Sequence, residues 1–218
     1  MPNVKQPKRE SAMNKLKSTL PNMILSLGLI GIVAGGLLGG MYAITKDPIA
    51  EAEKRQLTAS IAEVAPAFDN SPENDRDTVK IEGKDFIIYP AIEKGKLNGA
   101  AVLGYTMEGF SGEVAVLCGF DAEGNVKDYR VIRHAETPGL GAKMEEWFHD
   151  PSGARSVIGK NPSVQNFYVT KDTEKHGEID AITAATISSR AFLGVMRQAY
   201  TAYREYAQTK GLELAPVN

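Results

Sequence analysis

Asp180-Ala-Ile-Thr-Ala-Ala-Thr-Ile-Ser-Ser189 is the stretch that decides how the C-terminal part of this chain folds. It places one acid, several hydroxyls and bare methyl side chains directly before apolar residues at helical spacing, from Ala191 to Tyr200. We therefore predict a long helix over residues 183–209. Because a helix N-terminus presents unpaired N–H groups and a positive dipole end, the stretch suits either a phosphate ligand or a simple N-cap cluster.

A second segment upstream has the composition of a tight turn that could face a ligand. It reads His134-Ala-Glu-Thr-Pro-Gly-Leu-Gly-Ala-Lys143. Pro138 fixes one φ angle, and the glycines on either side of Leu140 permit positive φ. Turns of this kind expose backbone N–H groups to a ligand. From these residues alone, an ordinary loop is the favoured interpretation.

Together the two segments resemble the FMN-binding domain family. Its attachment motif reads Asp-x-x-Ser/Thr-Gly-Ala-Thr-x-Ser/Thr-Ser, and it also carries a His-x-Glu-Thr-Pro-Gly-Leu-Gly segment. The family includes the G subunit of the Rnf electron-transport complex and the C subunit of the sodium-pumping NADH:quinone reductase. The resemblance covers nearly the whole chain, and Ala184 stands where the family usually has Gly. The short chain and the Ile-Ser-Ser ending of the motif favour the Rnf G subunit over the C subunit.

This resemblance implies a site for FMN attached through a phosphoester to Thr186. It also implies that Asp180 belongs to the sequence read by a separate flavin transferase, which this chain does not resemble. Leu140 would lie against the flavin ring, and Lys143 would pair with the phosphate or an acid. The expected cofactor-binding residues are Asp180, Thr183, Ala185, Thr186, Ser188, His134, Glu136, Thr137, Gly139, Leu140 and Lys143. No catalytic residue is expected, because a flavin that passes electrons between cofactors needs no proton-abstracting side chain.

The N-terminal part of the chain reads as a membrane anchor. Residues 18–45 contain no charge, and from Met23 to Thr45 the run is long enough to cross a bilayer core of about 30 Å. The alternative is a cleaved signal peptide, whose hydrophobic region usually spans only about 7–15 residues. Five basic residues precede the run, so the positive-inside rule predicts a cytoplasmic N-terminus and an extracytoplasmic, or periplasmic, remainder at the bacterial inner membrane.

Glycines recur within this anchor at a spacing that suits close helix packing. Gly31, Gly35 and Gly39 form one row, and Gly36 and Gly40 form another. Such rows let helix backbones approach each other in lipid, which suits contact with other membrane subunits. The alternative is that glycine is simply common in membrane helices.

Charge and cysteine content exclude several classes of function. The net charge is −2, and residues 46–218 hold 20 of the 25 basic and 26 of the 27 acidic residues, which argues against a nucleic-acid partner. The single cysteine, Cys118, cannot form an intramolecular disulfide and reads as a buried small apolar residue. The three histidines are scattered, so we predict no metal site.

The pattern of apolar residues predicts an α+β fold with one transmembrane helix and a largely antiparallel sheet with flanking helices. We expect a cytoplasmic basic tail over residues 1–20, a transmembrane helix over 21–45, a linker helix and loop over 46–78, and an FMN-binding domain over 79–218. The expected shorter elements are a helix over 48–68 ending near Pro66, strands over 79–81, 85–89, 99–106, 113–120, 126–133 and 164–170, a hairpin turn over 122–125, and a helix over 145–149.

The resulting functional prediction is a membrane-anchored subunit that carries covalent FMN. It would relay electrons within an Rnf-type ion-translocating ferredoxin:NAD oxidoreductase complex, with no turnover of its own. Its partners would be other membrane and redox subunits, a flavin transferase and membrane lipid. Two other classes stay open: a hydrolase with Thr186 as nucleophile and His134 as base, and a cofactor-free, membrane-tethered binding module.

Overall fold

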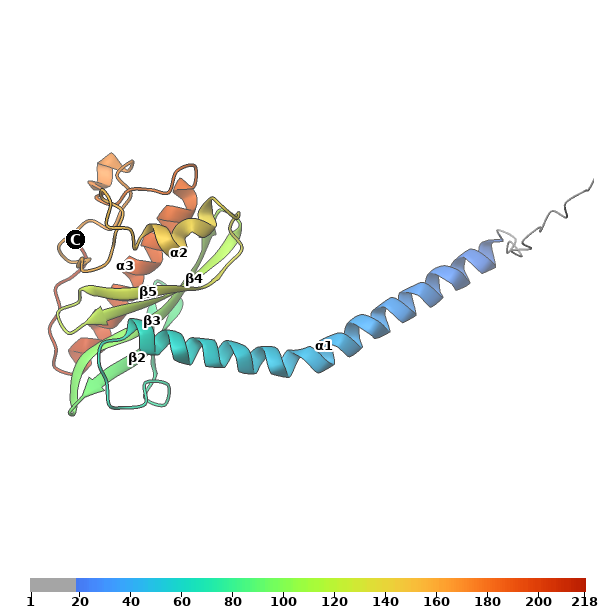
Figure 1. The fold of residues 1–218 in the computed structure, drawn as a ribbon, viewed down its shortest axis with the longest axis horizontal. Coiled ribbons are helices and arrows are strands. Elements are labelled where there is room, and N and C mark those ends of the chain that lie inside the picture. Colours follow the sequence, from blue (N-terminus) through green and yellow to red (C-terminus); the bar gives the residue numbers. More distant parts are fainter. Residues whose placement is uncertain (1–18) are drawn as a thin grey trace, which may run out of the picture. The chain divides into compact units, whose positions relative to one another are not determined.

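The globular part of the chain is built on one antiparallel sheet whose five strands lie in chain order (Figure 1). The computed structural model describes residues 19–218, so residues 1–18 of the predicted basic tail lie outside the described residues. The α+β prediction is confirmed, as are the five strands up to residue 133. The elements are α1 (Leu20–Val64), β1 (Asp77–Ile81), β2 (Lys84–Glu93), β3 (Lys96–Gly109), β4 (Gly112–Asp121), β5 (Val126–His134), α2 (Met144–Trp147) and α3 (Thr186–Thr209), with short 3-10 turns η1 (Gly141–Lys143) and η2 (Thr173–Lys175).

Helix α1 is continuous where the sequence predicted two separate helices. Pro48 lies inside it, although proline cannot donate the hydrogen bond to the carbonyl four residues earlier. The helix therefore tolerates the loss of one bond rather than restarting. It ends at Val64, two residues before Pro66, because the residue preceding a proline is disfavoured in the α conformation. Within residues 19–218, α1 is the one helix long and apolar enough to cross a membrane.

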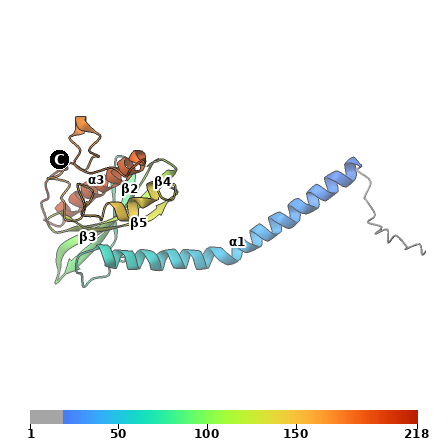
Figure 2. The same cartoon turned by 45° about the horizontal axis from the view of Figure 1, so that its top comes forward.

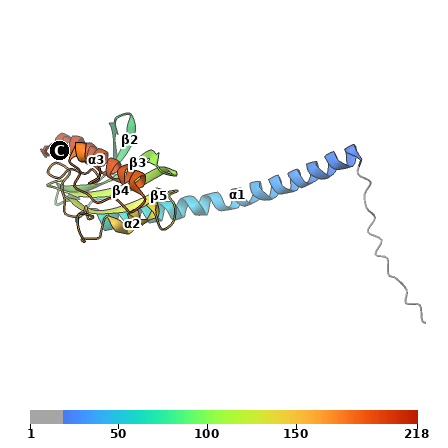
Figure 3. The same ribbon diagram turned by 90° about the horizontal axis from the view of Figure 1, so that it is seen from above.

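The globular unit begins at Lys54, within the last turns of α1. Residues alternate between the two faces of the sheet, as the period of a strand requires. One face is covered by α3, and the opposite face is covered by the final turns of α1 (Figures 2 and 3). The face under α3 carries Phe86, Ile88, Ala100, Val102, Val116, Cys118 and Phe120, and the other carries Tyr89, Ala91, Ala101 and Leu117.

The final turns of α1 sit very close to β4. A Cβ atom at Gly119 would collide with the carbonyl oxygen of Val64, so only glycine permits this approach. An ion pair between Arg130 Nε on β5 and Glu63 Oε2, 2.8 Å apart, holds the same end of the helix. The end of α1 is therefore part of the globular core and not only a connection to it.

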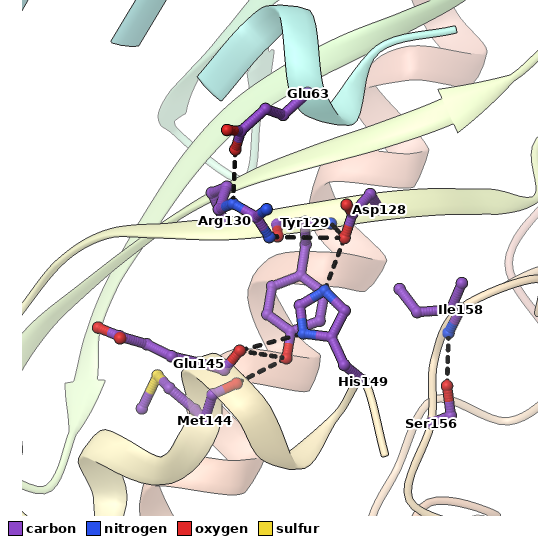
Figure 4. A network of polar contacts seen from close by, with 9 residues as sticks. All are labelled: Glu63, Asp128, Tyr129, Arg130, Met144, Glu145, His149, Ser156 and Ile158. Atoms are coloured by element: carbon purple, nitrogen blue, oxygen red, sulfur yellow. Dashed lines mark hydrogen bonds and ion pairs between the residues drawn. The ribbon is translucent and has the colours of Figure 1, made fainter. Parts of the chain in front are cut away.

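A polar network on β5 fixes α2 beside the sheet (Figure 4). The hydroxyl of Tyr129 donates to the carbonyl oxygen of Met144 at 2.7 Å, and its ring stacks on His149 with 4.0 Å between centroids. His149 Nε2 lies 2.6 Å from Asp128 Oδ1. Burial raises the pKa of Tyr129, which keeps this hydroxyl a donor. The loop that leaves β5 is thereby anchored at both ends.

Two smaller predictions have different outcomes. The hairpin turn over residues 122–125 is confirmed, because β4 ends at Asp121 and β5 begins at Val126. The strand predicted over residues 164–170 is wrong, since the only pairing there is one isolated parallel bridge between Val169 and Ile179. Asn161 explains the difference: its side chain accepts from the backbone N–H of Ser163 at 2.9 Å, and such local bonds favour turns over a strand.

Candidate functional site

The two segments singled out in the sequence line the same cavity, although about 45 residues separate them in the chain. The cavity has a volume of about 320 Å³, within the range of small-ligand sites. It lies between the β3–β4 hairpin, the loop after β5 and the start of α3. Its lining residues are Phe110, Glu136, Thr137, Leu140, Gly141, Ala184, Ala185, Thr186, Ile187 and Ser188.

Thr186, the predicted attachment residue, is the first residue of α3. The helix begins at Thr186, three residues later than predicted, because a turn precedes it. The N–H of Ala185 donates to the carbonyl oxygen of Ile182 at 3.0 Å, and Ala184 has φ +61°. A positive φ only at the third position of a turn is the pattern of type II, which normally takes glycine there. The turn lifts Thr186 to the rim of the cavity.

Buried hydrogen bonds hold this turn against the helix. Ser189 is fully buried, and its hydroxyl accepts from the N–H of Ile182 at 2.9 Å and donates to the carbonyl oxygen of Ala185 at 2.9 Å. No side-chain hydrogen bond caps α3 at Ala185. The hydroxyls of the motif therefore do not form the simple N-cap cluster that was the alternative interpretation.

The floor of the cavity is a buried carboxylate shared by three segments. Glu136 is 4% exposed, and its Oε2 accepts from the hydroxyl of Ser188 at 2.7 Å. Its Oε1 accepts from the N–H of Ser111 in the β3–β4 hairpin at 3.2 Å. A Cβ atom at Gly141 would lie 2.6 Å from both Glu136 Oε2 and Ser188 Oγ, so glycine is needed for this pair to form. Glu136 thus joins the two motifs directly.

The walls of the cavity are apolar and partly open to solvent. Phe110, Leu140 and Ile187 all line it while remaining 67%, 41% and 48% exposed. Large apolar side chains exposed around a cavity are typical of a site that receives an apolar ligand. Lys171, which lines a neighbouring cavity, adds a cation beside Thr186, with Nζ 3.4 Å from Thr186 Oγ1. These residues fit a cofactor that has a flat apolar ring and an anionic phosphate.

Several predicted site residues do not line this cavity. His134 contacts Glu145 Oε1 through Nε2 at 3.2 Å, and its Nδ1 accepts from the N–H of Glu136 at 3.2 Å. His134 therefore orients the loop. The hydrolase alternative would need it to contact Thr186, and these bonds direct it elsewhere. Gly139 is exposed with φ +75°, as the turn prediction required, and Lys143 is exposed in η1.

Asp180 and Thr183 also lie outside the lining. Asp180 accepts from the N–H of Ala154 and from the hydroxyl of Thr170, each at 3.2 Å, and its carbonyl oxygen accepts from Trp147 Nε1 at 2.9 Å. It holds α2 and two points of the segment between α2 and α3 together, and it does not cap α3. Thr183 is exposed at the second position of the turn.

Sequence reasoning missed Phe110, Ile187 and Lys171. Phe110 lies close to two glycines, Gly109 and Gly112, at a hairpin tip, and an aromatic residue in such a turn was a usable signal. Lys171 lies 15 residues before Thr186 in a segment wrongly predicted to follow a strand, so nothing local indicated its position.

Comparison with known proteins identifies two matching family descriptions. A family described as FMN-binding domain matches residues 109–201, which include every cavity-lining residue. A family described as RnfG N-terminal region matches residues 13–64, which include α1.

Relatives named as the G subunit of an ion-translocating oxidoreductase complex match along most of the chain. The chain is similar to the protein of this name from Aliivibrio fischeri, with 31% identity over 92% of this chain and 97% of that protein. The protein from Cereibacter sphaeroides is 32% identical over 90% of each chain. That of Pseudomonas aeruginosa is 30% identical over 92% of this chain and 94% of its own.

Proposed function

Because the chain belongs to the family of G subunits of ion-translocating oxidoreductase complexes, we propose that it relays electrons within an Rnf-type complex through FMN held at Thr186. The observation that carries the proposal is the cavity shared by the two motifs, with Thr186 at its rim. The match to the RnfG N-terminal region favours this family over the C subunit of a sodium-pumping NADH:quinone reductase.

The FMN-binding domain contributes a site for the cofactor, and when bound the flavin can accept and release electrons singly. The protein's own residues hold and orient the ring. Phe110, Leu140 and Ile187 provide apolar contacts, while Glu136 and Ser188 fix the floor. The partly open walls leave an approach for a neighbouring redox subunit. We expect no turnover from the isolated chain, because a flavin that relays electrons needs other subunits to supply and remove them.

The position of the Thr186 hydroxyl supports the proposal of covalent attachment. This oxygen lies at the cavity rim, beside the cation of Lys171 and at the start of α3, where unpaired N–H groups favour an anion. In attachment, the Thr186 Oγ1–phosphorus bond forms and a phosphoric anhydride bond in a flavin donor breaks. The donor's other phosphate leaves, and the hydroxyl proton is released. A separate flavin transferase supplies the catalytic groups for this step.

The remaining chain features support the predicted cellular context. The uncharged part of α1 would anchor the protein in the bacterial inner membrane, in contact with lipid, with residues 1–20 cytoplasmic and the FMN-binding domain, residues 79–218, on the periplasmic side. Its two glycine rows would pack against other membrane subunits of the complex. Residues 46–78 would link the anchor to the domain.

The test is the mass of the chain produced with a flavin transferase. We expect the parent chain to carry one FMN through denaturation, and Thr186→Ala to lose both this mass and the flavin fluorescence. Thr183→Ala is the matched control, because it removes the same group from an exposed residue outside the cavity. It should retain the flavin.

Two outcomes would contradict the proposal. Flavin retained by Thr186→Ala but lost by Thr183→Ala would mean that the acceptor is the other hydroxyl. A parent chain that stays colourless with an active transferase and flavin donor would exclude the flavoprotein function altogether.

A further inference from the structure

Lys171 is a cation in direct contact with the proposed acceptor hydroxyl, with 3.4 Å between its Nζ and Thr186 Oγ1. Its backbone is held in place on both sides. The N–H of Thr170 donates to the carbonyl oxygen of Ile179 at 2.8 Å, and the N–H of Asp172 donates to that of Val169 at 2.8 Å. The lysine therefore extends from a fixed point of the fold toward the rim of the cavity.

Two acids near Lys171, Asp172 and Asp180, are bonded to other residues. Asp172 is paired with Arg190, with 2.5 Å between Nη2 and Oδ1, and this hydrogen bond lowers the pKa of Asp172. Asp180 is bonded to Ala154 and Thr170. Within residues 19–218, no carboxylate forms an ion pair with Lys171. Its positive charge is therefore available to an external anion.

A neighbouring cavity of about 490 Å³ is lined by several cations, and among them Lys171 contacts Thr186. Lys171 lines it together with Lys175 and Arg190, but neither of these is bonded to Thr186. The ammonium group of Lys175 lies 4.8 Å from the centre of the Tyr168 ring instead. Two exposed lysines thus border one cavity, and only one of them contacts the acceptor.

We propose that Lys171 is a positioning residue for FMN attachment, and that its ammonium group pairs with the flavin phosphate as the bond to Thr186 Oγ1 forms. The inference rests on the function proposed above. A protonated lysine cannot take the hydroxyl proton, so its role is to neutralise phosphate charge. An exposed ion pair of this kind contributes about three- to fivefold to a rate or an affinity.

The experiment compares the rate of FMN attachment in matched variants of the full chain. Each is incubated with flavin transferase and a flavin donor, and intact mass is followed over time. We expect Lys171→Met to slow attachment about three- to fivefold, Lys171→Arg to restore it, and Lys175→Met to match the parent. Raising the salt concentration from about 0.05 M to about 0.5 M shortens the Debye length to about one third. The difference in attachment rate between the parent and Lys171→Met should therefore become smaller.

The thermal unfolding midpoint of each flavin-free variant distinguishes an effect of the lost charge from an effect of lost stability. This midpoint should not change, because Lys171 and Lys175 are both exposed. Equal rates for the parent and Lys171→Met would overturn the inference, as would equal slowing by Lys175→Met. In either case Thr186 would still carry the flavin, so the proposed function would stand. A parent chain that gains no FMN at Thr186 would overturn both.

Discussion

Ala184 holds a backbone conformation that normally belongs to glycine. Its φ of +61° brings Cβ close to the following carbonyl, at a cost of about 1–2 kcal/mol for a residue with a side chain. The family motif usually has glycine at this position, and the geometry explains why. The chain retains the turn in spite of this strain because Ser189 bonds to both ends of it.

Ala184→Gly should therefore stabilise the protein. We expect the free energy of unfolding to rise by about 0.5–1 kcal/mol, after allowing for the greater unfolded-state freedom of glycine. Denaturant unfolding followed by fluorescence of Trp147, the single tryptophan, measures this. The control is Ala135→Gly, an exposed loop position that is not among the positive-φ residues, where a small loss is expected. Stabilisation by both changes would refute the strain argument.

At the scale of elements, Glu136 links a hairpin, a loop and a helix. Replacing it with alanine leaves the buried hydroxyl of Ser188 and the N–H of Ser111 without their partner. We expect Glu136→Ala to lower the free energy of unfolding by about 1–3 kcal/mol. Ser188→Ala should cost a similar amount, and the double variant should cost less than the sum, because both remove one interaction.

Glu145→Ala is the control for that experiment. Glu145 also contacts the loop, through His134 at 3.2 Å, but its side chain is 57% exposed. We expect a change of at most about 0.5 kcal/mol. Strictly additive losses at Glu136 and Ser188 would show that the two residues act independently.

The elements that the sequence predicted well are those with a regular period. The five strands alternate between two covered faces, and residues 191–207 of α3 keep a helical stripe against the sheet. The predictions fail where local hydrogen bonds determine the backbone conformation. Because of the type II turn, α3 begins only at Thr186. The hydrogen bond of the Asn161 side chain favours turns where a strand was predicted over 164–170. The contact between Lys171 and Thr186 could not be predicted, because it depends on the path of that irregular segment.

At the scale of the whole molecule, the uneven charge predicts one orientation in the membrane. Five basic residues precede the uncharged run, whereas the rest of the chain has an acidic excess. A reporter enzyme that is active only outside the cytoplasm, fused after Asn218, should give a signal. Changing the five basic residues before the run to glutamine should reduce that signal, and a signal only from a reporter that works in the cytoplasm would reverse the assignment.

The position of Thr186 at the start of α3 also sets an order in time. A ribosome makes the sheet strands first and α3 last among the elements described, yet α3 covers one whole face of that sheet. A chain interrupted before Thr186 would lack both this residue and the helix that covers that face. Under the proposed function, the flavin therefore marks only chains whose synthesis has passed the entire sheet and reached the start of α3.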